Sequence, residues 1–348
     1  MREPAADLRR IAFLLERANA STYKVKAFRT AAAAVIALDP VEIAGRVEAG
    51  TLKELSGVGD STAGVIAASV AGEEPEYLRK LEADDVSFAD VPLDDAATAL
   101  LAELKGDLHT HSDWSDGGSP PVEMAWTARE LGREYIALTD HSPRLKVANG
   151  LTAARLRKQL DVVRVINERL APFRVLTGIE VDILDDGSLD QDPELLAELD
   201  VVVASVHSKL AMPPKAMTRR MVTAVQNPLV DVLGHCTGRM VKPRAGRNPQ
   251  GRPESEFDAA AVFEACASSG VAVEINSRPE RLDPPRRLVT QALSAGCLFS
   301  IDTDAHAPGQ LDWRQTGASR ASACGVPAER ILTAWDLDTL LAHLDART

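Results

Sequence analysis

The chain has 348 residues, 45% of them hydrophobic, and a formal net charge of −12 at pH 7. This length allows two domains or one large domain with an appendage, and the apolar content suffices for a packed core. The acidic balance argues against broad, nonspecific nucleic-acid binding, which needs a basic surface. The N-terminus lacks an apolar signal core, no apolar run is long enough for a membrane span, and the four cysteines are widely spaced. We therefore expect a cytoplasmic protein with no membrane partner.

Residues 1–75 are predicted to form a small all-helical domain. Apolar periodicity and a helix-opening proline indicate helices in three stretches, around 8–15, over 23–38 and from Pro40. Residues 55–61 then follow the pattern apolar, any, Gly, apolar, Gly before a further helix over 62–70, which is typical of a helix-hairpin-helix. Such a hairpin lets backbone N–H groups approach a DNA phosphate, and the candidate DNA-binding residues are Gly57, Val58, Gly59, Ser61, Lys24 and Lys26. The alternative is an αα-hairpin that only packs.

Residues 76–105 are predicted to be an acidic linker, and residues 106–348 a second domain in which strands alternate with helices. Seven apolar runs end in polar residues: a short run before His109, and 135–141, 175–180, 201–207, 230–235, 271–276 and 298–306. Helices are expected between them at 120–131, 152–170, 193–199, 214–225, 256–268 and 285–295. Continuous apolar strands separated by helices predict a parallel sheet, and seven such units favour an α/β fold of the (β/α)7 type, a distorted TIM-like barrel.

Six of the seven histidines close one of these predicted strands. His109 and His111 point the same way in an extended segment, and an Asp-Gly turn returns Asp116 toward them. The others at strand ends are His141, His207, His235 and His306, whereas His343 is expected to be an ordinary core or surface residue. Because barrel active sites lie at the C-terminal ends of the strands, this pattern predicts a site for divalent metal ions.

Motifs around these residues resemble the PHP (polymerase and histidinol phosphatase) superfamily. The stretches are Asp107-Leu108-His109-Thr110-His111, Leu138-Thr139-Asp140-His141, Gly178-Ile179-Glu180, Ser205-Val206-His207, Leu233-Gly234-His235 and Asp302-Thr303-Asp304-Ala305-His306. Within it, the chain is most similar to the PHP domain of bacterial X-family DNA polymerases, and 23–32 with 52–59 resemble their small N-terminal domain. It resembles such a polymerase without the polymerase core. The linker is too short for that core and the helix over 61–70 has no lysine, so neither polymerase nor lyase activity is expected.

The resemblance implies three divalent ions, which can be Mn, Zn or Fe. One would be held by His109, His111, Glu180 and Asp304, a second by Glu180, His207 and His235, and a third by Asp116, His141 and His306. Closely spaced ions give a bridging hydroxide near neutral pH, held here through Glu180 and Asp304, and this chemistry is phosphoester hydrolysis. Candidates for phosphate binding are the polar residues after strand ends, namely Arg278, Arg281, Arg239, Lys209, Arg144 and Asn276. Each of the charged ones could instead face solvent.

A Pro- and Gly-rich basic loop over 242–253 is expected at the rim of the active face, either as a local positive patch or as a mobile solvated loop. The favoured function is a DNA phosphoesterase, a 3′-5′ exonuclease or an enzyme of 3′-end or abasic-site processing in repair. Its partner would be DNA, as a single strand or at 3′ ends, nicks or gaps. The alternatives are a small-molecule phosphomonoesterase of histidinol-phosphatase type and a noncatalytic DNA-binding or scaffold protein. The sequence indicates no particular protein partner.

Overall fold

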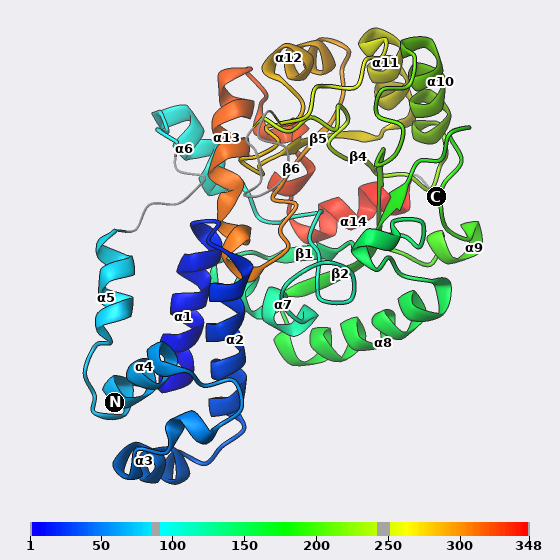
Figure 1. Cartoon of the computed structure of the whole chain (residues 1–348). Coiled ribbons are helices and arrows are strands. Elements are labelled where there is room, and N and C mark those ends of the chain that lie inside the picture. The colour runs from blue at the N-terminus through cyan, green and yellow to red at the C-terminus, as the bar shows by residue number, and fades with distance from the viewer. Residues whose placement is uncertain (1, 85–90, 242–250, 347–348) are drawn as a thin grey trace. The chain divides into compact units, whose positions relative to one another are not determined.

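The computed structural model describes residues 2–84, 91–241 and 251–346 (Figure 1). The chain divides into two compact units, Met1–Phe88 and Ala89–Thr348. Within the described residues, no helix combines the length and the apolar character that crossing a membrane requires.

The first unit is helical, as predicted. Its helices are α1 (Pro4–Arg17), α2 (Thr22–Ile36), α3 (Pro40–Ala49), α4 (Asp60–Val70) and α5 (Glu76–Ala83), with a 3-10 turn at Leu52–Glu54. Leu8, Ile11 and Leu15 recur at helical spacing along α1 and are buried against Phe28 of α2 and other apolar residues. The proline that opens α3 has no N–H to satisfy, and the Asp39 side chain accepts the next one, from Val41, at 2.8 Å.

The second unit contains a parallel six-stranded sheet whose strands are paired in chain order. The strands are β1 (Tyr135–Leu138), β2 (Arg174–Asp182), β3 (Val201–Ser205), β4 (Val232–Leu233), β5 (Ala272–Asn276) and β6 (Phe299–Asp302). The helices are α6 (Asp95–Glu103), α7 (Pro121–Glu130), α8 (Ala153–Leu170), α9 (Pro193–Leu196), α10 (Pro214–Val225), α11 (Ala259–Ser269), α12 (Arg286–Ser294), α13 (Arg314–Ala323) and α14 (Leu337–Asp345). This is the α/β architecture that the sequence predicted.

The predicted strand before His109 is the exception, since it forms no regular strand in the described chain. It is an irregular segment that bridges both edges of the sheet, because Thr110 pairs in parallel with Leu138, the last residue of β1, and with Ala305 after β6. Backbone N–H groups that would otherwise pair between strands donate to carboxylates here: Leu108 N donates to Asp302 at 2.7 Å, and Thr303 N donates to Asp107 at 3.3 Å. The barrel is therefore closed by side chains and single bridges at this point.

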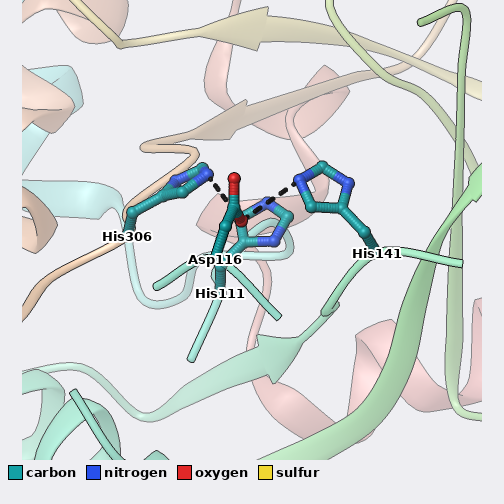
Figure 2. A group of neighbouring side chains, drawn as sticks. All are labelled: His111, Asp116, His141 and His306. Atoms are coloured by element: carbon teal, nitrogen blue, oxygen red, sulfur yellow. Dashed lines mark ion pairs between the residues drawn. The ribbon is translucent and has the colours of Figure 1, made fainter. Parts of the chain in front are cut away.

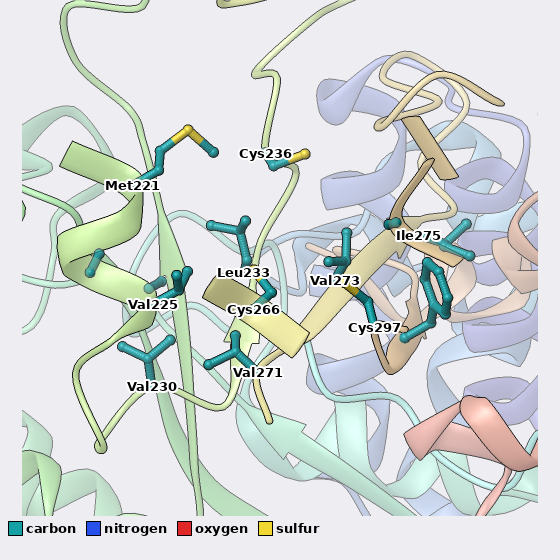
Figure 3. Close-up of a cluster of buried hydrophobic side chains, with 14 of the residues drawn as sticks. Met221, Val225, Val230, Leu233, Cys236, Cys266, Val271, Val273, Ile275 and Cys297 are labelled. Carbon is teal, nitrogen blue, oxygen red and sulfur yellow. The ribbon is translucent and has the colours of Figure 1, made fainter. Parts of the chain in front are cut away.

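Alternate residues of each strand face opposite sides of the sheet. Outward-facing side chains such as Leu233 and Val273 belong to the main core cluster, which also includes Met221 and Val225 of α10 (Figure 3). Inward-facing side chains near the strand starts, such as Val203, form a second apolar cluster with Leu340 and Leu344 of α14. The inward positions at the strand ends are polar instead, and they carry the candidate site.

Candidate metal centre

Glu180, near the end of β2, lies at the middle of the polar end of the barrel and is 1% exposed. Five imidazoles surround its two oxygens: three follow the strands β1, β3 and β4, and two belong to the irregular segment 107–111. The distances from the Glu180 carboxylate are 2.8 Å to His235 Nε2, 2.8 Å to His141 Nδ1, 3.2 Å to His207 Nε2, 3.4 Å to His109 Nε2 and 3.7 Å to His111 Nε2. Parallel strands bring these distant residues together because all their C-terminal ends meet at one face.

A neighbouring group consists of His111, Asp116, His141 and His306, whose ligand atoms all lie within 4.8 Å of one another. Figure 2 shows the Asp116 carboxylate between the rings of His141 and His306, at 3.4 and 3.3 Å from their Nε2 atoms. The side chain of Asp116 is 36% exposed, whereas that of His111 is fully buried. Asp304 lies beside this group, with Oδ1 at 3.6 Å from His111 Nε2. All nine residues expected to hold metal are therefore gathered in one region.

The neutral tautomer of two histidines follows from their outer partners. His109 Nδ1 lies 2.6 Å from Glu274 Oε1, and His207 Nδ1 lies 2.5 Å from Asp182 Oδ1. Because these carboxylate oxygens accept from the imidazoles, Nδ1 carries the proton in each neutral ring, which leaves the Nε2 lone pair for a metal ion. This carboxylate–histidine arrangement is typical of metal ligands.

The charges in the metal-free centre are strongly coupled. Burial alone would raise the pKa of Glu180, but the imidazoles of His207, His109 and His141 hold it well below its usual value. Burial alone would lower the pKa of His141, but the carboxylates of Glu180 and Asp116 raise it to about 10. Burial and the neighbouring rings of His306 and His141 keep the pKa of His111 well below its usual value. The carboxylate is therefore ionised, and protons occupy several imidazoles that face it.

These residues satisfy a test for divalent metal binding. Among the described residues, both Glu180 oxygens and the ring nitrogens of His109, His111, His141 and His207 that face the centre are buried. These atoms approach one another as ion pairs, but none of them makes a well-directed hydrogen bond within the described chain. Buried polar atoms of this kind are costly unless something binds them. Metal–ligand bonds of about 2.1 Å place two neighbouring ligands of one ion roughly 3.0–3.4 Å apart, and the distances of 2.8–3.7 Å around Glu180 span this range. The donor set suits Zn, Mn or Fe(II).

The residues proposed for phosphate binding differ in whether their donors already have partners within the protein. Arg278 is buried and donates from Nη1 to the Asp304 carbonyl at 2.6 Å, and the Asn276 amide donates to Asp304 and Glu274, each at 3.2 Å. These two residues support the centre from outside. Arg281 donates from Nε to Asp304 Oδ2 at 3.0 Å, while its buried Nη1 has no hydrogen-bond partner in the part of the chain that the structure describes.

The remaining basic candidates have other partners. Arg239 donates to the carbonyl oxygens of Arg281 and Leu282, so it fixes the loop after β5. Lys209 pairs with Asp185 and is largely exposed, and Arg144 is exposed as well. Most of the predicted basic loop, residues 242–250, lies outside the described residues. Arg281 is thus the basic candidate with a free donor at the centre.

The candidate DNA-binding residues all belong to the first unit. Gly57 has φ +86°, and a Cβ there would overlap the Thr30 side chain, so the hairpin turn requires glycine at this position. Gly59 precedes α4, and its N–H donates to the Thr62 hydroxyl at 2.9 Å. Val58 is buried, whereas Ser61, Lys24 and Lys26 are exposed. The hairpin therefore has the tight turn and helix start that the sequence predicted.

Sequence reasoning missed three buried carboxylates that support the ligands. Glu274 lies two residues before Asn276 in β5, and Asp182 lies two residues after Glu180 in β2, so both share the inward face of their strand. Asp140 directly precedes His141 and accepts hydrogen bonds from Ser112 at 2.8 and 2.6 Å. The signal that could have identified Glu274 and Asp182 is that each lies two residues from another candidate site residue, on the same face of its strand.

Comparison with protein families identifies the two units. Residues 107–278 match the PHP domain, and residues 2–74 match a helix-hairpin-helix domain. The chain therefore combines a PHP domain with an N-terminal helix-hairpin-helix domain, as the resemblance predicted.

Individual relatives include both polymerases and phosphatases. The chain is 40% identical over 244 residues to the DNA polymerase/3′-5′ exonuclease PolX of Bacillus subtilis, a match that covers 70% of this chain and 41% of that protein. This chain therefore spans less than half the length of that relative. It is 28% identical over 211 residues to a probable phosphatase of Thermoanaerobacter sp., covering 58% of this chain and 78% of that protein. A solved structure of histidinol phosphate phosphatase from Lactococcus lactis, complexed with Zn, L-histidinol and phosphate, is similar with a TM-score of 0.45 and 19% identity, covering 64% of this chain and 95% of that one.

Proposed function

We propose that this chain is a metal-dependent phosphoesterase that acts on DNA, as a 3′-5′ exonuclease or in the processing of 3′ ends or abasic sites. The observation that carries the proposal is the buried cluster of imidazoles around Glu180, whose facing atoms lack hydrogen bonds within the described residues. The helix-hairpin-helix match and the 40% identity to PolX support DNA as the substrate. The segment between the two domains, residues 76–105, is too short for a polymerase core, and for this reason we propose hydrolysis without synthesis.

Three divalent ions, when bound, would lower the pKa of water and stabilise negative charge on the reacting phosphate. The residues that would hold them are His109, His111, Glu180 and Asp304; Glu180, His207 and His235; and Asp116, His141 and His306. Glu180 is shared between two groups because each of its oxygens faces different imidazoles. The Nη1 donor of Arg281 would bind a nonbridging phosphate oxygen, since it is held beside Asp304 with this donor free.

A second candidate is a small-molecule phosphomonoesterase. It is favoured by the similarity to a probable phosphatase of which the match covers 78%. The same metal chemistry would serve both substrates, so the distinction lies in whether the helix-hairpin-helix unit delivers a nucleic acid.

The test is incubation of the purified full chain with Mn and a 5′-labelled oligonucleotide, single-stranded or gapped, in parallel with a simple phosphomonoester. Asp304→Ala removes a carboxylate beside the centre. His343→Ala is the matched control, because His343 packs against the Trp335 ring and lies on α14 among the apolar residues at the other end of the barrel.

A ladder of shortened labelled products with wild type and His343→Ala, absent with Asp304→Ala, would support the DNA nuclease. An intact oligonucleotide together with rapid phosphate release from the monoester would overturn it in favour of the second candidate. Activity that survives in Asp304→Ala would contradict the proposed centre.

A further inference from the structure

The loop that carries Asp116 depends on a buried carboxylate outside the proposed ligand set. Asp140 is 1% exposed and accepts hydrogen bonds from Ser112 N at 2.8 Å, from Ser112 Oγ at 2.6 Å and from Ser115 Oγ. Ser112 and Ser115 lie between His111 and Asp116 in the chain. Because Asp140 directly precedes His141, it ties the Asp116 loop to the segment that carries this ligand.

Helix α8 holds the same loop from the other side. Gln159 is 1% exposed and donates from Nε2 to Asp140 Oδ2 at 2.6 Å. Arg155, one helical turn earlier on the same face, donates to the Trp114 carbonyl inside the loop. Both side chains reach the loop because residues four apart on a helix lie one above the other.

The loop itself is tight. Gly117 N donates to the Ser112 carbonyl at 2.9 Å, and a Cβ on Gly117 would lie 2.6 Å from that carbonyl group. Asp116 is nonetheless the most exposed member of its group, with side-chain exposures of 36% for Asp116 against 15% for His306 and 7% for His141. Besides its contacts with His141 and His306, the position of its carboxylate therefore depends on the loop.

We propose that Asp140, Gln159 and Arg155 form a clamp that sets the affinity for the ion of Asp116, His141 and His306 without contacting the metal. The proposal rests on the proposed metal centre and names positioning residues for one of its three ions. The other two ions should be affected much less, because their ligands His109 and His207 have other outer partners, Glu274 and Asp182.

The test changes the charge of the residue that donates to Asp140. Gln159→Glu places a second carboxylate against Asp140 Oδ2, and like charges at this distance repel in a buried site. We expect the affinity for one of three Mn ions to fall by about 10- to 100-fold, the usual effect of losing an outer partner. Adding Asp140→Asn restores a donor opposite the new carboxylate, so Asp140→Asn/Gln159→Glu should recover most of the lost affinity.

Gln226→Glu is the matched control, because this exposed residue ends α10 at the opposite end of the barrel and takes the same charge change. Bound Mn is counted by equilibrium dialysis and by the electron paramagnetic resonance signal of the free ion, and the fold is monitored by thermal melting in EDTA. If Gln159→Glu does not fold, Arg155→Met is used, which releases the Trp114 carbonyl from the helix surface and should weaken the same single ion.

Three Mn ions in wild type, two tight ions in Gln159→Glu and three again in the double variant would support the clamp. Three equally tight ions in both wild type and Gln159→Glu would overturn the clamp while leaving the metal centre intact. Loss of the ion in the double variant as well would refute the pairing of Gln159 with Asp140. Fewer than three ions in wild type would overturn the proposed centre itself, and the clamp with it.

Discussion

Glu180→Gln keeps the shape of the central side chain and removes its charge. In the metal-free protein, the carboxylates of Glu180 and Asp116 raise the pKa of His141 from 6.5 to about 10. Since a tenfold change in an equilibrium is worth about 1.4 kcal/mol, this environment stabilises the protonated His141 by on the order of 5 kcal/mol. Asp116 remains in the variant, and we therefore expect Glu180→Gln to lower the free energy of unfolding by about 3 kcal/mol near neutral pH.

The pH dependence has a definite sign. The folded pKa of His141 lies above its unfolded value, so its stabilisation is complete below pH 6.5 and is lost as the pH rises toward 10. The folded pKa of Glu180 lies below 4.5, so its contribution is present above pH 4.5 and is lost as the pH falls through the folded value. The metal-free wild type should lose stability between pH 6.5 and 10, and Glu180→Gln should show a much flatter profile there.

Urea unfolding in EDTA at several pH values between 6 and 10 measures both effects. The control is Glu198→Gln, because Glu198 pairs with Arg157 at 2.7 Å but both side chains are about half exposed. Such an exposed pair contributes less than about 1 kcal/mol. Equal unfolding free energies and equal pH profiles for the two variants would refute the assignment of Glu180 as the charge at the middle of the centre.

Loading the metal-free protein with Mn near pH 7.5 should release protons from imidazoles with raised pKa values; identical calorimetric heats in two buffers of different ionisation enthalpy would contradict this. Arg281→Ala should raise KM for the phosphoester roughly 10- to 100-fold, as expected for a lost charged hydrogen bond. It should also lower Tm, because the buried Asp304 carboxylate loses a charged partner at 3.0 Å. Arg278→Ala should instead weaken metal binding, measured by dialysis, because it supports the Asp304 carbonyl. Gly57→Ala should lower the Tm of the first unit, and its DNA affinity measured by fluorescence anisotropy, more than Gly50→Ala does, because the two glycines have similar φ values but only a Cβ at position 57 would overlap the Thr30 side chain. Thr30→Ala should partly rescue Gly57→Ala. Equal effects of the two glycine variants would argue against an overlap with Thr30.

Much of this molecule was predictable because its main patterns are local. Apolar runs ending in histidine indicated parallel strands, and the shared end of such strands indicated that His141, His207 and His235 would meet. The helical unit and its hairpin followed from apolar periodicity and from Gly57 and Gly59. The prediction of a strand before His109 was wrong, because the carboxylates of Asp107 and Asp302 accept hydrogen bonds from backbone N–H groups there. The sequence gives no local signal for such contacts across the barrel.

The residue types and their order along the chain determined the parallel α/β barrel and the set of residues able to hold metal. Only the tertiary structure distinguished Arg278 from Arg281, which follow the same strand three residues apart. Arg278 is occupied by the Asp304 carbonyl, whereas Arg281 keeps one donor free, and this difference arises from residues supplied by the end of β6. Only the tertiary structure also identified Glu274, Asp182 and Asp140 as residues that support the ligands. Such a supporting residue is defined by its contact with another strand, loop or helix and not by its spacing along one of them.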